Sequence, residues 1–143
     1  MPVVVDASLA VAWCFEDEVT PYTDAVLVHL RNESAIVPAI WPLEVGNALI
    51  LGERRDRIGR AEMDEALHRL QSLPIVIAVE PLDHVWTSVL DLARAQRLTA
   101  YGASYLDLAL RRGAPLATLD ARLRDATLKV VVPLFDPDGP GSR

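Results

Sequence analysis

The chain has 143 residues, of which 51% are hydrophobic and 24% are charged, and its formal net charge is −6. This length suits one domain with a substantial core, and the composition argues against a disordered or fibrous protein. With 20 acidic against 14 basic residues, the charge also argues against a protein that holds nucleic acid through phosphate contacts alone.

The sequence predicts a cytoplasmic protein that does not enter a membrane. Cys14 is the only cysteine, so no disulfide can form within the chain. The apolar run at the N-terminus has no basic region before it and is followed at once by Asp6, which is unlike a secretory signal. No segment approaches the roughly 20 apolar residues that a membrane-spanning helix needs.

The first half of the chain predicts short strands alternating with helices. Strands are expected at residues 3–5 and 35–38, and helices at residues 7–15, 20–31, 41–55 and 61–72. Thr20 and Pro21 form a typical helix start, with Thr20 as N-cap. In the helix at 41–55, Leu43, Ala48 and Leu51 provide the apolar spacing.

The second half continues the alternation. Strands are expected at residues 75–79, 115–119 and 130–132, and helices at residues 83–97, 101–112 and 120–127. Asp83 is expected to cap the first of these helices, and Gly113 to end the second.

Apolar strands connected by helices predict a three-layer α/β/α sandwich around a mostly parallel central sheet. We expect one domain over residues 1–135, followed by a polar, disordered tail at residues 136–143 that is rich in Pro, Gly and Asp.

Two carboxylates follow predicted strands. Asp6 ends the first strand and Asp120 ends the strand at 115–119. In open α/β sheets, sites form outside the carboxyl ends of the strands. Each residue could equally act only as the N-cap of the helix that follows it.

A third carboxylate, Glu44, lies in the first turns of the helix at 41–55, where the helix dipole alone would favour it. Asn47 is three residues further on, on the same face, and could hold a carboxylate or a metal-bound water. Clustered carboxylates stay ionised near neutral pH only beside positive charge, and a divalent cation such as Mg²⁺ supplies it. Such a cation would also reconcile the acidic composition with binding of phosphate.

Four segments together resemble the signature blocks of VapC-type PIN domains. In chain order they are Val3-Val4-Val5-Asp6-Ala7-Ser8, Pro42-Leu43-Glu44-Val45-Gly46-Asn47, Leu98-Thr99-Ala100-Tyr101-Gly102-Ala103-Ser104-Tyr105 and Pro115-Leu116-Ala117-Thr118-Leu119-Asp120. One Asp-x-Ser motif is weak, but four blocks in this order extend the resemblance over nearly the whole chain.

The resemblance implies a PIN-like fold and endonucleolytic cleavage of RNA that depends on Mg²⁺ or Mn²⁺. It makes Asp6, Glu44 and Asp120 metal-binding and catalytic acids, with Ser8 supporting Asp6 and Thr118 lining the pocket. VapC-type proteins are toxins paired with a small VapB antitoxin, and many form homodimers. The resemblance therefore implies RNA, an antitoxin and a second copy as partners.

The third block departs from the family, because Gly102 occupies the position of its fourth acid. Asp107 is five residues further on and points roughly 140° away on a helix, so it cannot replace the missing ligand. We expect Asp107 to lie on the surface. Loss of one ligand predicts weak metal binding and slow or absent cleavage.

Two other functions compete with an active nuclease. The first is a catalytically silent PIN domain that binds RNA or an antitoxin, which Gly102 favours. The second is a phosphoacceptor or phosphatase with Asp6 as nucleophile, although Asp6-Ala7-Ser8 lacks the second acid typical of the haloacid dehalogenase pattern.

Overall fold

The computed structural model describes residues 1–139, and four parallel strands form its central sheet. The strands are β1 (Val3–Val5), β2 (Ala35–Pro38), β3 (Ile75–Ala78) and β4 (Leu116–Ala117), in the spatial order β3-β2-β1-β4. In this register Val4 pairs with Ile36 on one side and with Leu116 on the other. All strands therefore end at the same edge of the sheet, as the sequence predicts.

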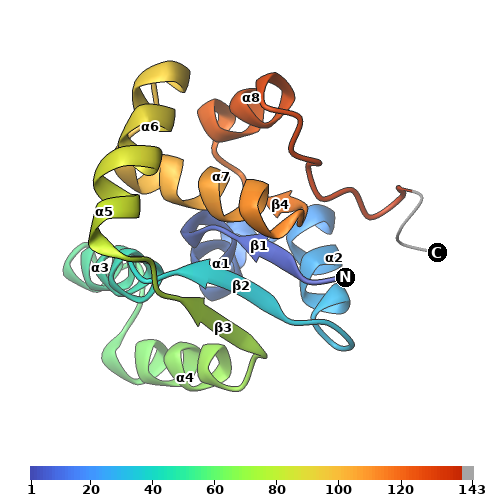
Figure 1. The fold of residues 1–143 in the computed structure, drawn as a ribbon. Helices are drawn as coiled ribbons and strands as arrows, with labels where there is room; N and C mark the ends of the chain where they lie inside the picture. Colours follow the sequence, from blue (N-terminus) through green and yellow to red (C-terminus); the bar gives the residue numbers. More distant parts are fainter. Residues whose placement is uncertain (140–143) are drawn as a thin grey trace.

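Helices cover the sheet in two layers (Figure 1). The first layer consists of α1 (Ala7–Cys14), α2 (Pro21–His29), α3 (Trp41–Arg54) and α4 (Arg60–Gln71). Within this layer α1 contacts each of the other three helices. The second layer consists of α5 (Leu82–His84), the π-helical segment η2 (Val85–Val89), α6 (Leu90–Gln96), α7 (Ala100–Arg112) and α8 (Ala121–Lys129). Within this layer α7 lies against the sheet. A short 3₁₀ turn, η1 (Glu16–Glu18), follows α1. The predicted three-layer α/β/α sandwich is confirmed.

β1 is the centre of the core, because its side chains point alternately to the two helical layers. Val3 and Val5 pack with Leu9 and Val26 of the first layer, whereas Val4 belongs to the cluster that contains Leu106 of α7. All three valines are at most 1% exposed. A strand buried on both faces holds the residue that follows it, Asp6, in a defined place at the carboxyl edge.

Two predicted helix boundaries are confirmed by their capping geometry. The Thr20 hydroxyl accepts a hydrogen bond from the backbone amide of Thr23, and Pro21 is the first residue of α2. Gly113 ends α7 with a φ of 59°, a left-handed conformation that glycine adopts without steric cost.

The predicted strand at residues 130–132 is wrong. α8 continues to Lys129, and Val131 then adopts a φ of 59°, which turns the chain back towards the sheet. The amide of Val132 bonds to the carbonyl of Thr127 instead of to a strand. The contact with β4 comes later, through a parallel bridge between Leu116 and Leu134.

The predicted continuous helix at residues 83–97 is interrupted. α5 and α6 are separated by the π-helical turns of η2, and Asp83 lies inside α5 instead of capping it. The Thr87 hydroxyl donates to the carbonyl of Asp83 at 2.7 Å. Such a bond to the carbonyl four residues earlier competes with regular helical bonding and can distort a helix.

The apolar positions expected for α3 are also largely wrong. Leu43 and Leu51 are 72% and 37% exposed, and the buried residues of α3 are Trp41, Val45, Leu49 and Gly52. Spacing alone could not decide between the two stripes, because α3 has apolar residues on both faces.

Two expectations concern the chain as a whole. Within residues 1–139 no helix is both long and apolar enough to cross a bilayer. Of the expected tail, residues 136–139 form a turn in which Gly139 donates to the carbonyl of Asp136, and residues 140–143 lie outside the described part of the chain.

Candidate metal-binding active site

Asp6 is held at the carboxyl end of β1 by two hydroxyl groups. Its carboxylate oxygens accept hydrogen bonds from Ser8 Oγ and Thr118 Oγ1, each at 2.5 Å. These hydroxyls are held in turn, since the amide of Leu119 donates to Ser8 Oγ at 2.9 Å and that of Asp120 donates to Thr118 Oγ1 at 3.0 Å. The start of α1 and the segment after β4 therefore meet at Asp6.

Burial raises the pKa of Asp6 to about 6, because the ionised carboxylate is 5% exposed and loses most of its hydration. The hydroxyls of Ser8 and Thr118 and the backbone of Leu9 lower the pKa, while the nearby charge of Asp120 raises it further. A buried carboxylate next to a second one gains strongly from a bound cation.

Asp120 is an N-cap as well as a neighbour of Asp6. Its Oδ1 accepts hydrogen bonds from the amides of Arg122 and Leu123 at 2.9 and 3.1 Å, at the start of α8. Among residues 1–139 no hydrogen bond reaches its other carboxylate oxygen, and the residue is exposed. The helix cap accounts for one oxygen and leaves the other accessible.

Glu44 of α3 is connected to the site through Tyr105 of α7, which orients it. The Tyr105 phenol donates to Glu44 Oε1 at 2.7 Å and is 2% exposed. Burial is the main cause of its strongly raised pKa, followed by the hydrogen bond to Glu44 and the charges of Glu44 and Asp6. The phenol therefore lies within the field of both carboxylates and stays protonated at neutral pH.

Sequence reasoning gave Tyr105 no role, although a signal was present. Tyr105 follows Gly102 by three residues, and this spacing puts both on one face of α7. Asn47 differs, since it is exposed and makes no side-chain hydrogen bond within the described chain. The structure thus gives Glu44 the support of Tyr105 instead of the expected support of Asn47.

Gly102 lies in the first turn of α7, where its amide donates to Thr99 Oγ1 at 3.0 Å. A Cβ at this position would meet only Thr99 Oγ1 at 3.4 Å and Leu98 Cβ at 3.8 Å, which are ordinary contact distances. The backbone therefore accepts a Cβ at this position without rearrangement.

Asp107 is buried, which corrects the expectation that it lies on the surface. It is 6% exposed, accepts from Arg111 Nε at 2.9 Å and lies 3.0 Å from His84 Nε2. Arg111 also pairs with Glu80 after β3. The ion pairs of Arg111 with Asp107 and Glu80 compensate for burial of the charge and connect α7 to the end of β3, and the hydrogen bond of His84 connects α7 to α5.

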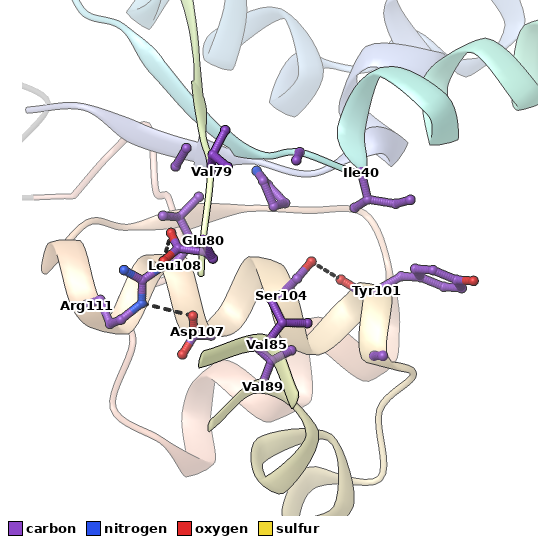
Figure 2. Close-up of a pocket in the computed structure, with 14 residues that line it drawn as sticks. Ile40, Val79, Glu80, Val85, Val89, Tyr101, Ser104, Asp107, Leu108 and Arg111 are labelled. Atoms are coloured by element: carbon purple, nitrogen blue, oxygen red, sulfur yellow. Dashed lines mark hydrogen bonds and ion pairs between the residues drawn. The ribbon is translucent and has the colours of Figure 1, made fainter. Parts of the chain in front are cut away.

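This ion-pair network borders an apolar pocket of about 280 Å³ (Figure 2). Ser104, Leu108 and Arg111 line it from a face of α7 different from that of Gly102 and Tyr105. None of Asp6, Glu44 and Asp120 lines it. The pocket is thus separate from the candidate site.

The donor set of the candidate site suits a hard divalent cation. Every donor is a carboxylate or hydroxyl oxygen, the ligand type that Mg²⁺ and Mn²⁺ prefer. Within residues 1–139 no three Asp, Glu, His or Cys side chains form a ready metal-binding cluster. The site therefore fits a cation held by one or two carboxylates, with water completing the coordination.

Comparisons with known proteins identify the family to which the fold belongs. No curated protein matches the sequence closely enough to be counted as a relative. A solved structure, PAE2754 from Pyrobaculum aerophilum, superimposes with a TM-score of 0.67 at 26% identity, over 92% of this chain and 98% of that one. Residues 3–128 match the PIN domain, and since this is most of the chain, the protein belongs to the PIN domain family.

Proposed function

We propose that this chain is a metal-dependent endoribonuclease of the VapC type whose activity is impaired by Gly102. PIN domains are generally nucleases that use divalent metal ions. The observation that carries the proposal is the buried Asp6 carboxylate, held by two hydroxyls beside Asp120. Uncompensated burial of a carboxylate is costly, and a catalytic cation at this place would offset the cost.

In the proposed site one or two of the acids Asp6, Glu44 and Asp120 would bind Mg²⁺ or Mn²⁺ directly, and the remaining acid would hold water molecules bound to the ion. When bound, the ion would polarise a water and neutralise charge that develops on the phosphate during in-line displacement. Ser8 and Thr118 orient the Asp6 carboxylate, and Tyr105 keeps one Glu44 oxygen occupied. Asp120 stays anchored at the start of α8 through Oδ1.

A cleavage assay tests the proposal. A fluorescently labelled single-stranded RNA is incubated with Mg²⁺ or Mn²⁺ and the wild-type chain, Gly102→Asp or the uncharged control Gly102→Asn. We expect Gly102→Asp to cleave faster than the other two, and Asp6→Asn in the Gly102→Asp background to abolish cleavage. Equal cleavage by Gly102→Asp and Gly102→Asn, or cleavage that survives Asp6→Asn, contradicts the assignment of the site.

The second candidate is a catalytically silent PIN domain that binds RNA or an antitoxin. Gly102 favours it, because the position lacks the carboxylate of the family pattern. This function predicts that the wild-type chain binds RNA or a VapB-type antitoxin but shows no metal-dependent cleavage at any Mn²⁺ concentration.

The toxin role, the VapB-type antitoxin, the homodimer and the cytoplasmic location stay predictions from the resemblance and the sequence. Light scattering after size-exclusion chromatography measures the oligomeric state. Co-expression with the product of a neighbouring short gene, followed by co-purification, tests for the antitoxin.

A further inference from the structure

A basic cleft lies between the end of α6 and α8. Its volume is about 470 Å³, and it is lined by Arg97 from the end of α6 and by Arg122, Asp125 and Lys129 from α8, together with uncharged residues. The three cations outnumber the one carboxylate, although the chain as a whole carries a net charge of −6. The local charge of the cleft is therefore opposite to that of the protein.

The cations of this cleft are not used in ion pairs. Within residues 1–139, salt bridges engage Arg57, Arg60, Arg94 and Arg111, but not Arg97, Arg122 or Lys129. All three cleft cations are exposed. They remain accessible to an anion from solution.

The cleft adjoins the candidate active site. Arg122 follows Asp120 by two residues, and Arg97 precedes Gly102 by five at the turn into α7. α7 contacts both α6 and α8, so it connects the two walls (Figure 1). Arg122 and Lys129 are seven residues apart, about 10 Å along α8. This length exceeds the distance between neighbouring phosphates of a nucleic-acid strand, so it can accommodate more than one phosphate.

We infer that this cleft binds the phosphate backbone of single-stranded RNA next to the bond placed at the acidic site. The inference rests on the proposed function, which supplies RNA as the substrate. The inference also explains how an acidic protein holds a polyanion. The cleft attracts the phosphates of the RNA backbone, and the carboxylates of the acidic site act, through the metal ion, only on the phosphate bound there.

Binding in EDTA isolates this step from cleavage. The probe is a fluorescein-labelled single-stranded RNA of mixed sequence, and anisotropy is measured over a range of salt concentrations. The test variant combines Arg97→Gln, Arg122→Gln and Lys129→Gln. The matched control combines Arg31→Gln, Arg54→Gln and Arg55→Gln, three exposed cations of the α1–α4 layer, so both variants lose the same charge.

We expect the cleft variant to bind RNA about tenfold or more weakly than wild type at low salt, and its salt slope to fall by about 2, given about 0.7 per phosphate contact on a single strand. The control should stay within about twofold. Circular dichroism verifies that both variants are folded. If the triple cleft variant does not fold, Arg122→Gln alone replaces it, with a smaller expected loss of RNA affinity.

Equal losses in the two triple variants overturn the cleft and leave RNA as the substrate. Absence of RNA binding by wild type also overturns the cleft, whereas metal-dependent cleavage by Gly102→Asp would show that the proposed nuclease function survives. Competition by polyglutamate as strong as that by unlabelled RNA would instead identify an acidic polypeptide as the occupant and contradict the inference.

Discussion

The phenol of Tyr105 donates a hydrogen bond to Glu44 Oε1 at 2.7 Å, and so joins α7 to α3 across the candidate site. Gly102 and Tyr105 share one face of α7, and Gly102 supplies no carboxylate. The Tyr105 phenol is therefore the polar group that this face directs towards Glu44 and Asp6. It is neutral, so it orients Glu44 without adding charge to the site.

Tyr105→Phe should weaken Mn²⁺ binding about tenfold, because groups that orient metal ligands typically contribute 10- to 100-fold to metal affinity. Electron paramagnetic resonance titration of free Mn²⁺ measures this effect. The matched control is Tyr101→Phe, which changes an exposed tyrosine of the same helix and should leave the affinity unchanged.

A double-mutant cycle separates positioning from general stability. If Tyr105 acts through Glu44, Tyr105→Phe should have little further effect on Mn²⁺ affinity in a Glu44→Gln background. Fully additive losses would show that Tyr105 acts independently of Glu44.

Gly102→Ala should stabilise the protein by up to about 1 kcal/mol, because alanine restricts the unfolded chain and favours the helix. The added Cβ has room, as its nearest contact is 3.4 Å. Gly46→Ala in α3, where a Cβ meets nothing within 4 Å, is the matched control and should give a similar gain in thermal unfolding. Mn²⁺ affinity should not rise in either variant. A rise for Gly102→Ala equal to that for Gly102→Asp would exclude the carboxylate as the cause.

The stability of the folded protein should depend on pH through Asp6. Its pKa is about 6 in the folded protein against an ordinary value of 3.8, so the folded state binds this proton more tightly than the unfolded state does. The resulting stabilisation is present below about pH 4 and is lost as the pH rises through about 6, a change on the order of 3 kcal/mol.

Asp6→Asn removes this dependence. Without metal, the variant should gain stability relative to wild type between pH 4 and pH 8, as measured by urea unfolding. Saturating Mn²⁺ at pH 8 should stabilise the wild type and not the variant, because only the carboxylate binds the ion. A difference between the two proteins that is the same at every pH would refute the role assigned to burial of Asp6.

Asp107→Ala should destabilise the protein by about 2 kcal/mol, since it removes the hydrogen bonds that this buried carboxylate accepts from Arg111 and shares with His84, while Arg111 keeps its pair with Glu80. Asp91→Ala breaks an exposed pair with Arg94 and should cost less than about 1 kcal/mol. Mn²⁺ affinity should be unchanged in both variants. Loss of metal binding on Asp107→Ala would mean that this network also supports the site.

The sequence was sufficient for features that depend on local order. The valines of β1 predicted a strand buried on both faces, and the fold class followed from the alternation of strands and helices. Thr20 and Gly113 marked helix ends because capping uses neighbouring atoms of the same chain. The positions of Asp6 and Asp120 after strands followed from the same local pattern.

Only the tertiary structure decided which side chains meet. Asp107 is buried because His84 and Arg111 surround it, and no spacing along α7 reveals a partner 23 residues away on α5. Tyr105 reaches Glu44 across 61 residues for the same reason. Residues 130–132 favour a strand by composition, but α8 extends to Lys129 and the chain must then turn back towards the sheet. The bridge to β4 therefore forms only at Leu134. Hydrogen bonding and charge compensation act between elements brought together by packing, so they become visible only when the packing is known.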